Sequence, residues 1–112
     1  MNKKRVHTPE GVRDVYGTEY GQRSKLKAKL NKVFASYGYE GIRTPGFEFF
    51  DVFNSEKGTV SAREMFKFFD REGNTLVLRP DVTPSIARCI AKYFNEENMG
   101  IRLSYAGNVF LK

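Results

Sequence analysis

The sequence is poor in the residues that build disulfides, metal centres and membrane spans. Its 112 residues include one cysteine, Cys89, one histidine, His7, and no tryptophan. A single cysteine excludes an internal disulfide and suits a reducing compartment. One cysteine and one histidine are too few for a zinc site built from such ligands. Apolar runs are far too short to cross a bilayer, and none follows the basic start MNKKR as in a secretory signal. We therefore expect a cytoplasmic protein without a metal or a membrane partner.

Patterns of nucleotide binding and of acid–base catalysis are also missing. Neither common phosphate-binding loop, GxxxxGK[ST] or GxGxxG, occurs in the chain. The carboxylates Asp51, Glu64 and Asp70 show no spacing that argues for paired acid–base work. His7 lies in a basic lead-in and is expected in solvent, and Cys89 has apolar neighbours, which favours a partly buried residue. The residues therefore predict no catalytic group and no cofactor.

The positive charge is concentrated at one end of the chain. Residues 1–32 hold nine basic and three acidic residues, and so the whole net charge of +6, while residues 33–112 hold ten of each. Such a stripe attracts RNA or phosphates, or it is the solvated face of a lysine-rich helix. No aromatic stacking pattern or arginine-rich segment accompanies it. We favour the solvated face and expect no nucleic-acid partner.

An amphipathic helix is predicted over residues 18–37. Its apolar stripe repeats at spacings of three and four and consists of Leu26, Leu30, Val33, Phe34 and Tyr37. Thr18 is a candidate N-cap, and Gly38 stands where a helix ends in a left-handed residue.

Short strands and one more helix are expected in the rest of the chain. In order they are a strand at 39–44, a strand passing into a helical turn at 47–53, a loop at 54–63, a hairpin of 65–69 and 75–79, a helix from Thr83 to Phe94, and a strand at 101–110. The phenylalanines at 47, 49, 50 and 53 are expected in the core. This order predicts an α+β fold with a largely antiparallel sheet, and the length predicts a single domain.

The segment LRPDVTPSIAR, residues 78–88, gathers polar groups where a strand meets a helix. Strand alternation places Arg79 and Asp81 on one face. Asp81 suits an ammonium or an imidazole N–H, Thr83 carries a hydroxyl, and the first N–H groups of the helix favour a carboxylate. These groups together suit a zwitterion such as an amino acid.

A purely structural interpretation of the same segment stays open and is favoured by the residues alone. Arg79 then pairs with Asp81, and Thr83 serves as the N-cap of a helix whose first residue is Pro84. Arg88 lies about one and a half turns into that helix. It braces an acidic partner as readily as it faces a ligand.

Four segments in this order resemble the class II histidyl-tRNA synthetase family. They are TPEGVRD, ASYGYEGIRTPGFE, EMFKFFDREGNTLVLRPDVTPSIAR and RLSYAGNVF, and together they cover nearly the whole chain. Asp81 and Pro84, where synthetases usually read LRPEGT, are more similar to the branch formed by regulatory subunits of ATP phosphoribosyltransferase. The resemblance implies a partial class II synthetase-like antiparallel sheet flanked by helices. It further implies that residues 1–112 form one partial domain, with motif 1 and the start of motif 2 but without motif 3.

The resemblance also implies a function. Asp81 and Thr83 fall at positions that contact histidine in the synthetases, and Arg79 is a possible support of that pocket. Residues 18–48 resemble motif 1, which forms a homodimer interface. A regulatory subunit is not catalytic: it joins a short catalytic chain for the first step of histidine biosynthesis and senses histidine. The alternatives are the N-terminal part of a synthetase that activates histidine and charges tRNA, and a free-standing domain that only dimerises.

One departure from the family pattern bears on activity. Motif 2 usually continues with an arginine after the phenylalanine, whereas here Phe110 is followed by Leu111 and Lys112. We therefore expect part of a histidine pocket without histidine activation, in a fragment or a truncated product.

Overall fold

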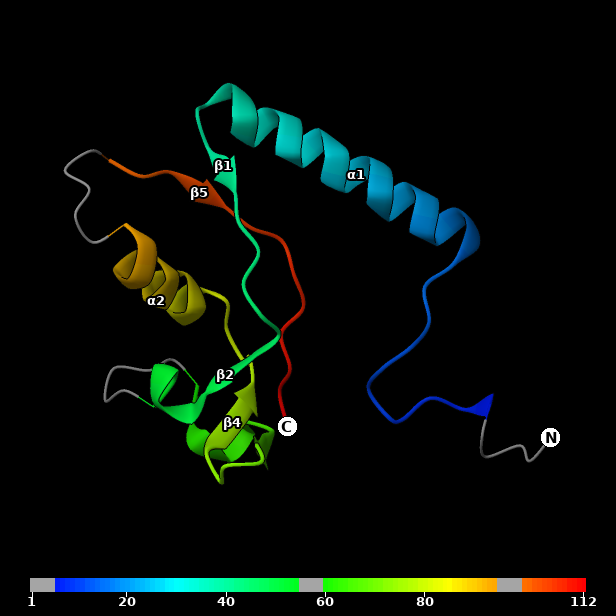
Figure 1. Cartoon of the computed structure of the whole chain (residues 1–112). Coiled ribbons are helices and arrows are strands. Elements are labelled where there is room, and N and C mark those ends of the chain that lie inside the picture. Colours follow the sequence, from blue (N-terminus) through cyan, green and yellow to red (C-terminus); the bar gives the residue numbers. More distant parts are fainter. Residues whose placement is uncertain (1–5, 55–59, 95–99) are drawn as a thin grey trace. The chain divides into compact units, whose positions relative to one another are not determined.

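The computed structural model describes residues 6–54, 60–94 and 100–112, in two compact units, Met1–Gly38 and Tyr39–Lys112. The first unit contains helix α1, Gly17–Ser36 (Figure 1). It confirms the predicted helix with its start moved by one residue. Thr18 is not the N-cap, because Tyr16 takes that position in an extended conformation and no side chain caps the helix. Gly38 has φ of 81°, which confirms the predicted left-handed end.

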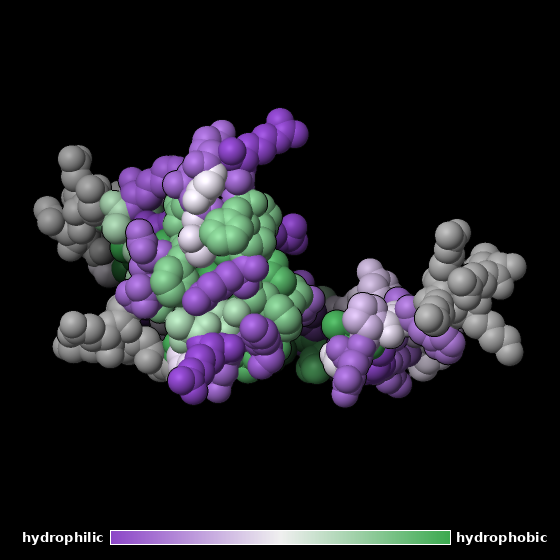
Figure 2. All heavy atoms as spheres, turned by 90° about the horizontal axis from the view of Figure 1, so that it is seen from below, coloured by the Kyte–Doolittle hydropathy of each residue, from purple (hydrophilic) through white to green (hydrophobic). Residues whose placement is uncertain are grey.

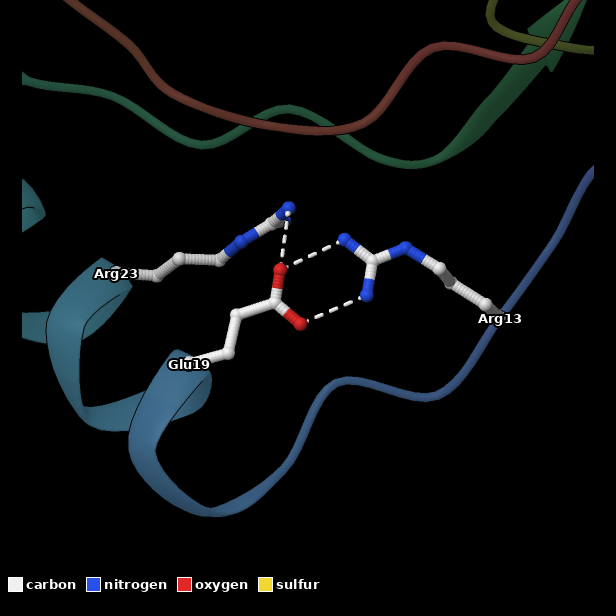
Figure 3. A network of polar contacts seen from close by, with 3 residues as sticks. All are labelled: Arg13, Glu19 and Arg23. Atoms are coloured by element: carbon white, nitrogen blue, oxygen red, sulfur yellow. Dashed lines mark hydrogen bonds and ion pairs between the residues drawn. The ribbon is translucent and has the colours of Figure 1, made fainter.

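An ion pair ties the lead-in to the start of α1. The Arg13 guanidinium donates two hydrogen bonds of 2.7 Å to the two carboxylate oxygens of Glu19, and Arg23 lies 3.4 Å from one of them (Figure 3). Glu19 belongs to the first helical turn, where a negative charge is favourable. The hydrogen bond from Arg13 lowers the pKa of the Glu19 carboxyl below its usual range. The motif TPEGVRD thus supplies, through Arg13, an ion pair to the first turn of α1.

The apolar stripe of α1 is exposed. Its members Leu26, Leu30 and Val33 have exposed fractions of 58%, 48% and 53%, and no residue of the helix is buried. Periodicity predicted the stripe, but among residues 6–38, which the structure describes in this unit, no second helix or strand covers it. The basic residues Lys25, Lys29 and Lys32 are also exposed.

A three-stranded antiparallel sheet forms the centre of the second unit. Its order is β2 (Phe47–Phe49), β4 (Thr75–Leu78), β3 (Lys67–Phe69). Strands β3 and β4 confirm the predicted hairpin, and the turn η2, Phe50–Val52, confirms the predicted passage from strand to helical turn. The predicted loop 54–63 lies partly outside the described residues, and its end continues into the 3₁₀ turn η3, Ala62–Glu64.

The hairpin turn is organised by one carboxylate. Asp70 Oδ1 accepts hydrogen bonds from the N–H groups of Glu72 at 3.0 Å and Asn74 at 2.8 Å, and Oδ2 accepts from the Asn74 side-chain amide at 2.9 Å. Gly73 has φ of 83° and supplies the left-handed residue that the turn needs. Together these contacts set the register in which Phe69 faces Thr75.

Two predicted strands are much shorter than expected, and they run parallel. Strand β1 is Glu40–Gly41 and strand β5 is Leu103–Ser104, and they form a separate two-stranded sheet. The predictions at 39–44 and 101–110 are therefore wrong in length. The pairing stops after the bond from Ile42 N–H to the Ser104 carbonyl, because the chain then turns toward Pro45, which has no N–H for a ladder.

The core cluster around Val77 lies on one face of the three-stranded sheet. Val77, Phe53 and Met65 are 0%, 4% and 3% exposed, and Phe50 packs against them, as predicted for Phe50 and Phe53. Phe47 and Phe49 are not in the core: they are 51% and 55% exposed.

The register explains this error. Glu48 pairs with Val77 and shares its buried face, so alternation turns both phenylalanines to the opposite face. Figure 2 shows apolar surface on this unit.

Helix α2, Thr83–Tyr93, follows β4 directly. Its contacts include the turn η2. Within the described residues, neither α1 nor α2 is long and apolar enough to span a bilayer.

Candidate ligand corner at the start of α2

The corner between β4 and α2 is a four-residue connection. The strand ends at Leu78, and the connection buries the two apolar residues Pro80 and Val82. Val82 is the N-cap, so Thr83 is the first helical residue and Pro84 the second. The predicted positions of Thr83 and Pro84 are therefore wrong by one residue. Pro84 still lies in the first turn, where its missing N–H has no cost.

Asp81 takes the role that the sequence predicted for Thr83. Its Oδ1 accepts a hydrogen bond of 3.2 Å from the N–H of Thr83. The Thr83 hydroxyl lies 3.2 Å from the hydroxyl of Tyr105, where either oxygen can donate. The aspartate thus satisfies the first N–H of the helix, and the threonine side chain contacts the segment that follows β5.

Arg79 leaves the corner in another direction. Its Nη1 donates to the Thr44 carbonyl at 3.1 Å, and its Nε donates to the Asn108 carbonyl. The strand ends at Leu78, so the strand alternation from which a shared face of Arg79 and Asp81 was predicted does not extend to these residues. Arg79 thus contacts backbone on both sides of the corner.

The corner offers acceptors and hydroxyls rather than a cluster of free N–H groups. Asp81 accepts the hydrogen bond of the Thr83 N–H, and Pro84 has no N–H. The carboxylate also adds a negative charge at the positive end of the helix. The helix start therefore has fewer N–H donors for a carboxylate than the sequence suggested. The arrangement of Asp81, Thr83 and Tyr105 instead suits an ammonium or an imidazole N–H.

Arg88 braces an acidic partner, which was one of the two roles left open for it. Its Nε lies 3.0 Å from both carboxylate oxygens of Glu48 on β2. The side chains are 31% and 8% exposed. This ion pair joins α2 to the central sheet and thereby holds the helix that begins at the corner.

Tyr105 and Glu48 have roles at or beside the corner that the sequence did not reveal. They are separated from their partners by 22 to 40 residues where a bond is formed, and no local spacing signals such contacts. His7 is exposed and Cys89 is half-buried, as predicted, and Asp51 and Glu64 are exposed.

Comparisons with known proteins place the chain among histidyl-tRNA synthetase-like proteins. The family model described as histidyl-tRNA synthetase matches residues 11–112. ATP phosphoribosyltransferase regulatory subunits from Acetivibrio thermocellus and Ruminiclostridium cellulolyticum are each 42% identical over 110 residues, covering 98% of this chain and 26% of the relative. The chain thus spans about a quarter of the length of these relatives.

Two solved structures have the same fold. One is an ATP phosphoribosyltransferase regulatory subunit/histidyl-tRNA synthetase from Bacillus halodurans, with a TM-score of 0.84, 31% identity, and coverage of 95% of this chain and 28% of that one. The other is the apo histidyl-tRNA synthetase of S. aureus, with a TM-score of 0.78, 30% identity, and coverage of 94% and 29%. The predicted α+β, class II synthetase-like fold is confirmed.

Proposed function

Because the chain belongs to the histidyl-tRNA synthetase family, matched over residues 11–112, we propose that it is the N-terminal part of a regulatory subunit of ATP phosphoribosyltransferase. In this proposal it senses histidine, activates a short catalytic chain, catalyses no reaction itself and works in the cytoplasm as a single domain. The 42% identity to proteins with that name supports the branch. The observation that supports histidine as the ligand is the corner at the start of α2, where a carboxylate and two hydroxyls lie close together.

Histidine fits the corner through its amino end. Asp81 is half-buried and holds a negative charge beside Thr83, so it is suited to accept a charge-assisted hydrogen bond from the α-ammonium group. The Thr83 and Tyr105 hydroxyls add donors and acceptors a few ångströms away. Arg79 already donates to two backbone carbonyls, so the carboxylate of histidine needs a different partner.

Calorimetric titration with histidine tests the assignment of Asp81. Asp81→Asn keeps an oxygen that accepts the Thr83 N–H but removes the charge, so the helix start is preserved. We expect histidine to bind about 10- to 100-fold more weakly, the size of a lost hydrogen bond between charged groups. Asp51→Asn, an equal change at an exposed carboxylate, is expected to leave the affinity unchanged.

A ligand analogue identifies which group of histidine Asp81 receives. Imidazolepropionate lacks the amine, so it is expected to bind weakly and equally to the native chain and to Asp81→Asn. Asp81 is not the ammonium partner if both proteins bind histidine equally, or if the substitution weakens the analogue as much as histidine.

The exposed stripe of α1 supports a homodimer through residues 18–48. Leu26, Leu30 and Val33 are about half exposed and lie on one side of the helix. Leu30→Glu places a charge on the stripe and is expected to shift sedimentation toward monomer, whereas Asn31→Glu adds the same charge off the stripe and is expected to have no effect. A native chain that sediments as a monomer at high micromolar concentration would contradict the dimer.

A synthetase remains the second candidate, because the matching family model and the S. aureus neighbour both carry that description. Binding to the short catalytic chain of ATP phosphoribosyltransferase separates the two. A regulatory subunit is expected to co-elute with that chain in size-exclusion chromatography, and the N-terminal part of a synthetase is not.

A further inference from the structure

Arg79 lies where three segments of the second unit meet. Its N–H donates to the Gly46 carbonyl at 2.9 Å, and its own carbonyl accepts from the Phe110 N–H at 2.9 Å. Its guanidinium donates to the carbonyls of Thr44 and Asn108. One residue at the end of β4 therefore holds the chain before β2 on one side and the chain after β5 on the other.

Gly107 is the residue that lets the guanidinium lie so close to the backbone. A Cβ placed on Gly107 would meet Arg79 Nη2 at 2.8 Å and Cζ at 3.4 Å. The φ angle of Gly107 is not in the left-handed region, so a side chain here is opposed by the arginine and not by backbone strain. The guanidinium has little freedom to move aside, because two carbonyls hold it from different segments.

The geometry points to Arg79 and Gly107 as a positioning pair for the ligand corner. Gly107 is two residues after Tyr105, and Arg79 is four residues before Thr83. Arg79, Thr44, Gly107 and Asn108 form a junction. This junction therefore sets the distance between the segments that carry Thr83 and Tyr105, whose hydroxyls lie 3.2 Å apart. Arg79 acts on the ligand through Tyr105 and Thr83, without touching it. This role rests on the histidine site proposed above.

Gly107→Ala tests the junction, and Gly46→Ala is its matched control. Both glycines flank contacts of Arg79, but a Cβ on Gly46 meets nothing within 4 Å. In the native chain, nuclear Overhauser contacts are expected between the Tyr105 ring and the Thr83 methyl group. Gly107→Ala is expected to remove them, to speed exchange of the Phe110 amide roughly tenfold, and to weaken histidine binding roughly tenfold, the size of one lost hydrogen bond from a charged donor. Gly46→Ala is expected to change none of the three.

A second variant keeps the test decisive if Gly107→Ala fails to fold. Arg79→Lys retains the charge but lacks the planar fork that reaches two carbonyls, so the Phe110 amide is expected to exchange faster. In the Arg79→Lys background, Gly107→Ala is expected to raise the exchange rate of the Phe110 amide by less than about twofold, because the atom that the new methyl group would meet is gone.

The outcomes separate this inference from the proposed function. If Gly107→Ala behaves like Gly46→Ala in the contacts and the exchange rate, the positioning pair is wrong. It is also wrong if Gly107→Ala moves Tyr105 while histidine binds as tightly as to the native chain. If the native chain binds no histidine, the proposed function fails, and the nuclear Overhauser contacts and amide exchange alone decide whether the pair positions Tyr105.

Discussion

Replacing Arg88 by methionine is expected to destabilise the second unit strongly. The change removes the charge but keeps an unbranched side chain of similar reach, and it leaves the Glu48 carboxylate, 8% exposed, without its ionic partner. Breaking a buried ion pair in this way costs about 3–5 kcal/mol. Because Arg88 is itself 31% exposed, water reaches the site, and we expect about 2–3 kcal/mol. With a urea m-value of about 1 kcal/mol/M, the midpoint of unfolding falls by about 2–3 M.

The lone cysteine provides a local assay for this change. Cys89 is half-buried on α2 next to Arg88, so its reaction with a thiol reagent in rising urea reports unfolding of this unit. Arg71→Met, at an exposed position of the hairpin turn, is the control and is expected to shift the midpoint little. In a double-mutant cycle, Glu48→Gln is expected to recover much of the loss. An equal shift for Arg71→Met and Arg88→Met, or coupling below about 0.5 kcal/mol, would refute the bracing role.

Two further predictions concern carboxylates with lowered pKa values. The pKa of Glu19 is lowered chiefly by its hydrogen bond from Arg13, so the stabilisation is present above the usual carboxyl pKa and is lost as the pH falls through the lowered value. Arg13→Gln is expected to return that pKa toward its usual range in a carboxyl NMR titration, and an unchanged pKa would contradict the ion pair. The pKa of Asp70 is lowered chiefly by the hydrogen bond from the Asn74 side chain. Its stabilisation is therefore also present above the usual carboxyl pKa and lost as the pH falls through the lowered value. Asp70→Ala is expected to speed exchange of the Asn74 amide, and an unchanged rate would show that the turn does not depend on the carboxylate.

Local patterns predicted the elements whose contacts are close in sequence. The helix 17–36, the hairpin around Asp70 and the helix that begins at Thr83 each depend on bonds between residues a few positions apart. Capping was less predictable, because both helices begin at a residue without a capping side chain, Tyr16 and Val82. At the corner, the sequence predicted Thr83 as the N-cap, but Val82 takes that position and Asp81 accepts the hydrogen bond of the Thr83 N–H.

Faces and pairings over longer distances were harder to predict. Phe47 and Phe49 are apolar enough for a core, but the register that buries Glu48 beside Val77 turns them outward. The parallel pairing of β1 with β5 joins segments about 60 residues apart, and a long connection of that kind leaves no local signal.

By itself, the sequence determined the order of the elements, the α+β class, the likeness to the histidyl-tRNA synthetase family, and the position of a polar corner at 79–83. Tertiary structure alone decided the partners: Arg79 with two backbone carbonyls, Thr83 with Tyr105, and Arg88 with Glu48. The physical reason is that backbone bonds inside a helix or a turn follow from neighbouring residues. A side chain at a corner instead bonds whichever group the packing of distant segments brings within reach.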